Sequence, residues 1–100
     1  MNKNFTRDYI VDLIRSHQKE LQDMGVKSLS IFGSAARNEL QAESDIDVLV
    51  EISQNIGLFK FHGIKRQMEA WFSRPVDLAT PNGLHPRLKK NILQEKIDVF

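Results

Sequence analysis

The spacing of apolar residues predicts a helix and then a strand near the start of the chain. Between residues 7 and 24 apolar side chains recur at steps of three and four positions, which is typical of an amphipathic helix. Gly25 is suited to end this helix, because glycine is favoured just after a helical C-terminus. Residues 26–32 are rich in β-branched and aromatic side chains and stop at a glycine. They are therefore expected to form a strand, with a short helix over 35–40 beyond the turn.

Strict alternation over residues 45–52 predicts a second strand. Side chains along a strand point alternately to its two faces. One face would carry Ile46, Val48, Val50 and Ile52, and the other Asp45, Asp47, Leu49 and Glu51. The apolar face is expected to pack against helices, which leaves the acidic face open to carry a site.

Helical spacing returns over residues 58–73 and stops before Arg74-Pro75, because the residue before a proline avoids helical backbone angles. The aromatic side chains of this helix are expected in the core: Phe59, Phe61, Trp71 and Phe72. A third strand is expected over 75–79. A third helix is expected to begin at Pro86, since proline fits the first turn of a helix.

These elements predict a fold of the α+β class, with α/β-type connections, in a single domain over residues 1–100. Three strands would form a small mixed sheet, with helices packed mainly on one face. Residues 97–100 are expected to pack the far end of the last helix back onto the core.

Composition excludes several classes of protein. With 14 basic and 13 acidic residues the charges nearly cancel, so direct binding to nucleic acid is not expected. The absence of cysteine excludes disulfides and thiolate zinc sites. The first residues lack a secretory apolar region, and no apolar run approaches the ~20 residues of a membrane span. We therefore expect a cytoplasmic protein that does not contact membranes.

The acidic pair Asp45 and Asp47 is the first candidate for chemistry. Two positions apart on a strand, both carboxylates leave the same face, separated by about 6–7 Å at the backbone. Like charges this close repel each other unless a proton or a hard cation intervenes. Oxygen ligands favour Mg²⁺ or Mn²⁺ over zinc. The alternative is a solvated strand edge, which the pair alone does not exclude.

Four further residues could complete a site. Gly33 and Ser34 open a helical stretch after a strand, where backbone N–H groups can approach a phosphate; the alternative is an ordinary turn with a serine N-cap. Asp77 could add a third carboxylate if its strand lies beside the first pair, or else be a surface residue before a turn. Arg37 could reach a phosphate or a partner, or be an exposed structural arginine.

The combination of Gly33-Ser34, Asp45-Ile46-Asp47 and Val76-Asp77-Leu78 resembles the minimal nucleotidyltransferases, the MNT antitoxin group of the DNA polymerase β superfamily. The resemblance extends from about residue 26 to residue 100. It implies the nucleotidyltransferase fold, contacts from Gly33 and Ser34 to the triphosphate of ATP, Asp45 and Asp47 as ligands of Mg²⁺ or Mn²⁺, and Asp77 as the third acidic member. We therefore expect Asp45, Asp47 and Asp77 to be the catalytic residues and metal ligands, and Arg37 to join Gly33 and Ser34 in binding the nucleotide.

The same resemblance implies a role. Many such proteins are antitoxins of HEPN/MNT toxin-antitoxin pairs, classed as type VII, that transfer AMP from ATP to a tyrosine of a HEPN ribonuclease toxin. The sequence departs from the group at Asn38, where glycine is common. Asparagine tolerates a left-handed backbone, so the turn is expected to survive.

Two other functions stay open at this point. The chain could be a non-catalytic module that neutralises its partner by binding alone, or its acidic cluster could serve a two-metal hydrolase or a nucleotide-sugar transferase. The three histidines are expected to be structural or solvated: His17, His62 and His85. The basic residues of the later helices could contact a partner or only solvent: Lys65, Arg66, Arg87, Lys89 and Lys90.

Overall fold

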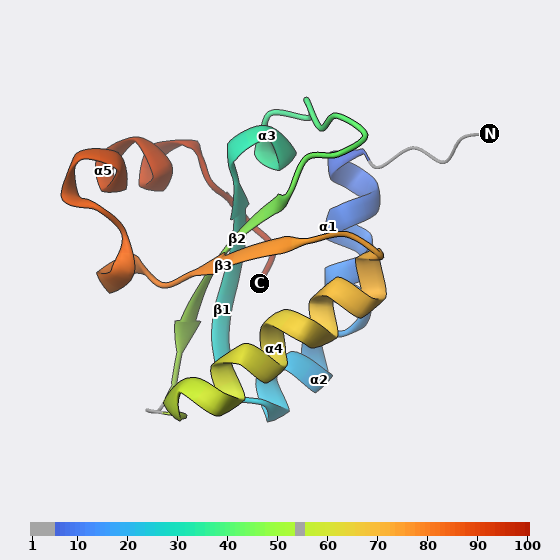
Figure 1. Cartoon of the computed structure of the whole chain (residues 1–100), viewed down its shortest axis with the longest axis vertical. Helices are drawn as coiled ribbons and strands as arrows, with labels where there is room; N and C mark the ends of the chain where they lie inside the picture. The colour runs from blue at the N-terminus through green and yellow to red at the C-terminus, as the bar shows by residue number, and fades with distance from the viewer. Residues whose placement is uncertain (1–5, 54–55) are drawn as a thin grey trace.

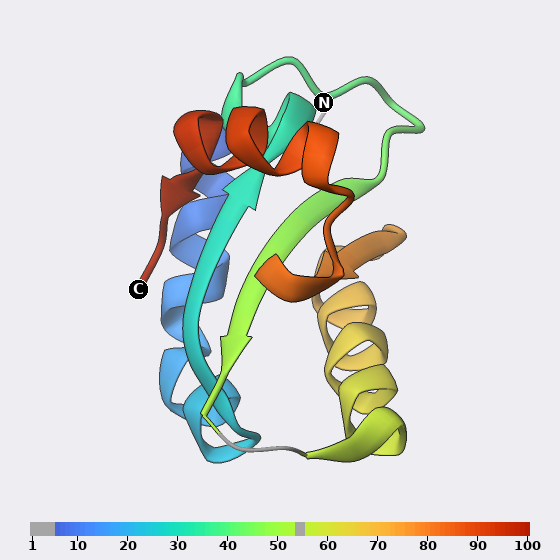
Figure 2. The ribbon, with the colours of Figure 1, turned by 90° about the vertical axis from the view of Figure 1, so that its left-hand side faces the viewer.

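A computed structural model of the chain describes residues 6–53 and 56–100. One mixed sheet has the strand order β3-β2-β1-β4 (Figures 1 and 2). Its strands are β1 (Val26–Phe32), β2 (Ile46–Ile52), β3 (Val76–Ala79) and β4 (Ile97–Asp98). β1 runs antiparallel to β2 and β4, whereas β2 runs parallel to β3. The predicted α+β class and mixed sheet are confirmed, and β4 is an added strand that the sequence pattern did not indicate.

Most helices cover one face of this sheet. They are α1 (Arg7–Ser16), α2 (Gln18–Asp23), α3 (Gly33–Ala36), α4 (Gly57–Phe72) and α5 (Pro86–Glu95), with a 3₁₀ turn η1 (Pro81–Gly83). In Figures 1 and 2, α1, α2 and α4 lie on one side of the sheet, while α5 and η1 lie on the other. The second face is therefore partly covered, and the last residue of α5 contacts the first residue of α3, since Glu95 accepts a hydrogen bond from the Gly33 N–H. In the described ranges 6–53 and 56–100 no helix is long and apolar enough to cross a membrane.

The core forms between β1, β2 and the helices on the first face. Its fully buried side chains include Ile10, Ile14 and Leu21 from α1 and α2, Ile46, Val48 and Val50 from β2, and Ile64, Met68 and Phe72 from α4. The apolar face predicted for β2 is thus confirmed. Asp47 and Glu51 lie on the opposite face of that strand, as the alternation predicts.

Phe59 corrects one expectation about this core. Its side chain is 85% exposed and that of Leu58 72%, whereas Phe72 is buried and Phe61 and Trp71 are partly buried. The fully buried stripe of α4 begins only at Ile64, so the first turn of the helix projects beyond the core. The spacing of apolar residues shows which side of a helix is apolar, but it does not show how far the sheet beneath that side extends.

The single helix predicted over residues 7–24 is two helices, because the backbone at His17 leaves helical angles (φ −113°, ψ 16°). The His17 ring stacks on the indole of Trp71 from α4, with ring centroids 3.7 Å apart and planes 8° from parallel. Its Nδ1 also lies 2.9 Å from the Glu20 carboxylate. The break therefore places an aromatic contact between α4 and the junction of α1 with α2.

We expect His17→Ala to lower the free energy of unfolding by about 1 kcal/mol, since it removes one stacked aromatic pair. Urea denaturation would measure this. The matched control is Lys19→Ala on α2, where the Lys19 side chain is 91% exposed and its Nζ lies 3.7 Å from the exposed carboxylate of Asp23. A surface change of this kind should stay within about 0.5 kcal/mol of the wild type. Equal losses in both variants would contradict a role for the stack.

Candidate active site

The carboxylates of Asp47 and Asp77 come from adjacent parallel strands in register. Asp47 on β2 is paired directly with Asp77 on β3, so the two side chains leave the same face of the sheet. Asp45 stands just before β2 and is exposed, as is Asp77, whereas Asp47 is half-buried. The structure therefore brings the three acidic residues singled out from the sequence together at one end of the sheet.

Gly33 lies against the half-buried member of this group. It follows the last residue of β1, and Phe32 of that strand is paired with Asp47. The φ of Gly33 is +64°, and a Cβ placed there would come within 2.2 Å of Asp47 Oδ2. Only glycine therefore fits this position, for both its backbone angle and its packing.

The turn at Gly33 and Ser34 differs in detail from the predicted one. The helix that follows is α3, which begins at Gly33 and ends at Ala36, so it starts earlier and is shorter than predicted. Its N-cap is Phe32, and no side chain caps it, so the alternative of a serine N-cap is not what the structure has. Ser34 is half-exposed and remains accessible to a ligand from solvent.

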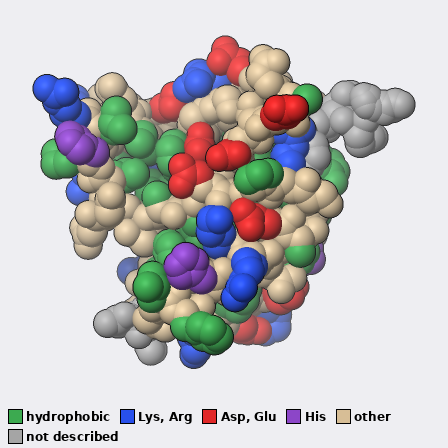
Figure 3. Space-filling model, viewed as in Figure 1, with side chains coloured by type: hydrophobic (Ala, Val, Ile, Leu, Met, Phe, Trp, Pro, Cys, Tyr) green, Lys and Arg blue, Asp and Glu red, His purple; other side chains and the backbone are tan. Residues whose placement is uncertain are grey.

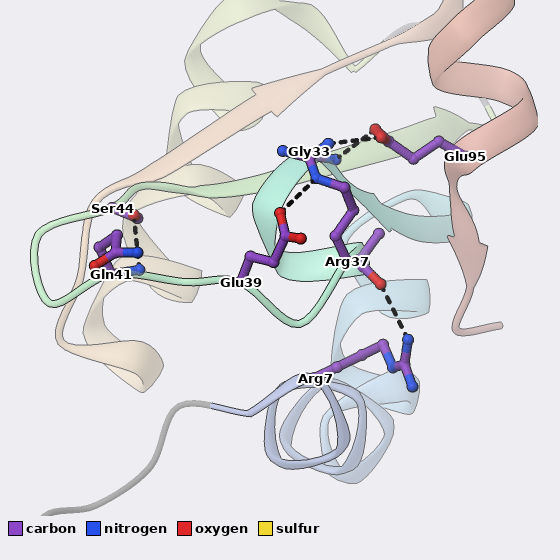
Figure 4. A network of polar contacts seen from close by, with 8 residues as sticks. Arg7, Gly33, Arg37, Glu39, Gln41, Ser44 and Glu95 are labelled. Atoms are coloured by element: carbon purple, nitrogen blue, oxygen red, sulfur yellow. Dashed lines mark hydrogen bonds and ion pairs between the residues drawn. The ribbon is translucent and has the colours of Figure 1, made fainter.

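Arg37 is held by two carboxylates at the end of α3 (Figure 4). Its Nε donates to Glu39 Oε1 at 2.9 Å, and its guanidinium donates a second bond to Glu95 Oε1 at 2.7 Å. The other oxygen of Glu95 accepts from the backbone N–H of Gly33 at 3.2 Å. The hydrogen bonds that Arg37 donates to Glu39 and then to Glu95 raise the pKa of its guanidinium.

Asn38 adopts the left-handed conformation that the sequence predicted for it, with φ at 61°. Its side-chain oxygen accepts from the backbone N–H of Arg7 at 2.8 Å, and the Arg7 guanidinium donates to Ala36 O at 3.2 Å. These two bonds tie α1 to the end of α3, and Figure 4 shows the one that the Arg7 guanidinium donates. Asparagine thus supplies both the turn geometry and an anchor that glycine would lack.

Burial and charge act together on Asp47. Burial, the largest cause, and then the charges of Asp77 and Asp45 together raise its pKa from the usual 3.8 to about 6. Arg37 opposes this rise, and Glu95 adds slightly to it. Figure 3 shows acidic side chains gathered in the upper half of the view, above the basic and histidine side chains that lie over α4. The site is therefore a local concentration of negative charge that a cation would relieve.

The donor set fits a magnesium ion held jointly with a nucleotide. All candidate ligands are carboxylate oxygens, which suit Mg²⁺ or Mn²⁺. Within the described part of the chain, no group of three or more His, Cys, Asp or Glu side chains is arranged so that it could hold a metal ion by itself. Mg²⁺ is usually bound by one or two carboxylates together with water and substrate phosphates, so a closed protein cage is not required.

Ionisation of Asp47 should make the metal-free protein less stable as pH rises. Because its folded pKa lies above the unfolded value, its contribution is fully present below about pH 4 and is lost as pH rises through about 6. We expect Asp47→Asn to remove this loss and to stabilise the metal-free protein near pH 7.5. The shift would correspond to about 3 kcal/mol at a fully buried site, and solvent screening at a half-buried one reduces this to about 1 kcal/mol.

Urea denaturation in a chelator at pH 4.5 and 7.5 would measure this difference. The control is Asp98→Asn, because hydrogen bonds from Lys96 and then Ser30 lower the pKa of Asp98. That substitution should destabilise the protein at both pH 7.5 and pH 4.5, because the contribution of Asp98 is lost only as pH falls below 3.8 toward the lowered pKa. If Asp47→Asn is no more stable than wild type at pH 7.5, ionisation of Asp47 does not destabilise the metal-free protein.

Other candidates lie apart from this cluster. Glu51 shares the Asp47 face of β2 but accepts a hydrogen bond from the Ser28 hydroxyl at 2.7 Å. His85 caps α5 by accepting from the Arg87 backbone N–H at 3.1 Å. Lys65 of α4 is paired with Glu69 at 3.2 Å. Glu95 is the residue that the sequence pattern missed, because the last position of a helix carries no local sign of contact with Gly33, 62 residues away.

Comparison with known proteins agrees with this geometry. The family model of the nucleotidyltransferase domain matches residues 14–99. A protein of Methanocaldococcus jannaschii, to which protein adenylyltransferase activity has been attributed, is 40% identical over 100 residues and matches the full length of both chains. A solved structure assigned as a minimal nucleotidyltransferase is 28% identical, with a TM-score of 0.71 over 87% of this chain and 93% of the other.

A second solved structure shares the fold. It is that of a toxin-antitoxin with AMP-PNP, and it superposes with a TM-score of 0.68 at 16% identity over 94% of this chain and 72% of the other. The sequence matches span nearly the whole chain, and the acidic strand ends and glycine turn lie within them. By family model, sequence and fold, this chain belongs to the nucleotidyltransferase family, as a minimal member of it, and is a transferase.

Proposed function

We propose that this protein transfers AMP from ATP to a hydroxyl group of a partner protein. The observation that carries the proposal is the in-register pair of Asp47 and Asp77 beside the glycine turn at Gly33. This arrangement puts carboxylates for a divalent cation next to backbone N–H groups that can donate hydrogen bonds to phosphate oxygens. A site for a magnesium-bound triphosphate needs both parts within reach of each other.

Each residue then has a distinct part in the reaction. Gly33 and Ser34 hold phosphate oxygens, and Arg37 supplies positive charge at the same place. Asp45 and Asp47, with Asp77, would hold Mg²⁺ or Mn²⁺. When bound, such an ion neutralises phosphate charge and holds the reacting groups in line.

Asp77 is also suited to act on the acceptor. It is exposed, so an incoming hydroxyl can approach its carboxylate, which orients the oxygen and accepts its proton. The hydroxyl oxygen forms a bond to the α-phosphorus of ATP, and the bond from that phosphorus to pyrophosphate breaks. AMP is then joined to the acceptor, and pyrophosphate leaves with the negative charge.

A protein acceptor is supported by the relatives. The matching Methanocaldococcus jannaschii protein carries an attributed protein adenylyltransferase activity, and the toxin-antitoxin structure with AMP-PNP has the same fold. We therefore propose that the acceptor is a toxin encoded beside this gene, with the hydroxyl of a tyrosine in a HEPN ribonuclease as the specific target. Modification would silence the toxin, and this chain would act as the antitoxin.

The test uses ATP labelled in the α-phosphate, Mg²⁺ and the purified product of the neighbouring gene. We expect label on that product, at a tyrosine identified by mass spectrometry, and none when the label is in the γ-phosphate. A chelator should abolish the transfer. If the two proteins form a stable complex but no α-label is transferred, neutralisation proceeds by binding alone and the proposed reaction is wrong.

A further inference from the structure

Glu95 occupies the place in which the proposed function seats a phosphate group. Its two carboxylate oxygens are each engaged, one by the Gly33 N–H at 3.2 Å and the other by the Arg37 guanidinium at 2.7 Å. These are two of the donors proposed to bind the triphosphate. A carboxylate with two engaged oxygens resembles a phosphate with two of its oxygens bound.

We propose that Glu95 is a residue of the nucleotide site, which holds the phosphate-binding donors in the free protein and must be displaced when ATP binds. This inference rests on the proposed function and deepens it. The Gly33 N–H carries one proton, so it cannot serve Glu95 and a phosphate oxygen fully at the same time. The carboxylate also adds negative charge beside Asp47, which a bound triphosphate would have to oppose.

Arg37 can stay in position while Glu95 leaves. Its Nε remains bonded to Glu39 Oε1 at 2.9 Å, and a guanidinium has five N–H donors in a fixed plane. Only the donors turned toward Glu95 would be released. The arginine is therefore already oriented for a phosphate, and the exchange replaces one anion with another at the same guanidinium (Figure 4).

The helix that carries Glu95 is weakly held against the rest of the molecule. None of the residues of α5 is fully buried, and Leu88 and Leu93 of this helix are largely exposed. Glu95 is its last residue, and its side chain is 30% exposed. A turn of the side chain or a small shift of the helix end can thus free the donors without exposing core residues.

The test compares the binding of Mg²⁺·AMP-PNP to wild type and Glu95→Gln by isothermal titration calorimetry. Glutamine keeps the shape of the side chain but removes its charge. Since a charge-assisted hydrogen bond is about twice as strong as a neutral one, we expect the dissociation constant of the variant to be about tenfold lower. The matched control is Glu39→Gln, which also removes a carboxylate from Arg37 but none from Gly33, and which should change affinity less than about threefold.

A second measurement follows the Gly33 amide by ¹H–¹⁵N NMR. Its resonance should shift on Glu95→Gln and shift again, in both proteins, when Mg²⁺·AMP-PNP is added. Glu95→Asp, whose shorter side chain keeps the charge, should leave the Gly33 amide resonance of the nucleotide-free protein close to its position in wild type. This readout does not depend on transfer activity, and it also reports whether each variant is folded.

The outcomes separate the two claims. Tighter binding by Glu95→Gln together with an unchanged Glu39→Gln supports the exchange. If wild type binds Mg²⁺·AMP-PNP and Glu95→Gln binds equally or more weakly, the exchange is wrong while the nucleotide site stands, and Glu95 instead positions Arg37. If none of the proteins binds Mg²⁺·AMP-PNP, the proposed function fails and the exchange fails with it.

Discussion

Asp47→Asn is expected to lower the rate of AMP transfer at least about a thousandfold, because a metal ligand supplies several kcal/mol of transition-state stabilisation and each factor of ten in rate is about 1.4 kcal/mol. Asparagine keeps the size of the side chain but removes the charge that would hold the cation. The initial rate of α-label incorporation into the neighbouring gene product measures the loss.

The control for this variant is Glu51→Gln on the same face of β2. Glu51 is bonded to Ser28 and stands away from the acidic cluster, so its removal should leave the rate within about threefold of wild type. Asp47→Asn should also be more stable than wild type without metal, as argued above. A variant that gains stability while it loses activity marks a residue placed for function.

A double variant that removes the charges of Asp45 and Asp47 separates catalysis from binding. If Asp45→Asn combined with Asp47→Asn still binds the partner and fully neutralises it, chemistry is dispensable and the non-catalytic alternative is correct. If binding persists while neutralisation is lost, the reaction is what protects the cell. A transfer rate within about tenfold of wild type in Asp47→Asn would remove Asp47 from the metal-binding role.

Gly33→Ala is expected to destabilise the protein by about 2–4 kcal/mol. One part of this cost is the left-handed backbone at φ +64°, which an alanine adopts poorly. The other part is the contact of the new Cβ with Asp47 Oδ2, only 2.2 Å away, which forces the carboxylate or the turn to move. Urea denaturation measures the loss, and transfer activity should fall with it because Asp47 is displaced.

A glycine elsewhere supplies the control. Gly63 lies inside α4, and a Cβ placed there meets no atom within 4 Å. Gly63→Ala should therefore stabilise the protein by about 0.5–1 kcal/mol, since alanine favours a helix. In a double-mutant cycle, Asp47→Ala should recover part of the stability lost in Gly33→Ala, because it removes the atom that the new Cβ meets. If the changes in the free energy of unfolding of the two single variants simply add in the double variant, the Cβ at position 33 does not clash with Asp47.

Local patterns were sufficient for most of the fold. The period of two over β2 correctly separated Val48 from Asp47, and the period near 3.6 located α4 to within a residue at each end. Asn38 was correctly expected to take the left-handed backbone. These features depend on neighbours within a few positions, so the local sequence is enough to determine them.

Other features depended on partners distant in sequence. β4 is two residues long and exists because it pairs with β1, so no periodicity marks it. The break at His17 depends on the ring of Trp71, 54 positions away, and the exposure of Phe59 depends on where the core ends beneath α4. Each of these was missed or mistaken for the same reason.

The amino-acid sequence by itself determined which residues could do chemistry here: an acidic pair on one strand face, a glycine turn before it and a third acid on a later strand. Only the tertiary structure decided that Asp77 lies directly beside Asp47, and that Gly33 lies against the Asp47 carboxylate. It also decided that Glu95 accepts hydrogen bonds from the Gly33 N–H and the Arg37 guanidinium. The reason is physical. Alternation is set by the geometry of a single strand, whereas the neighbours of a strand are set by burial and pairing over the whole chain.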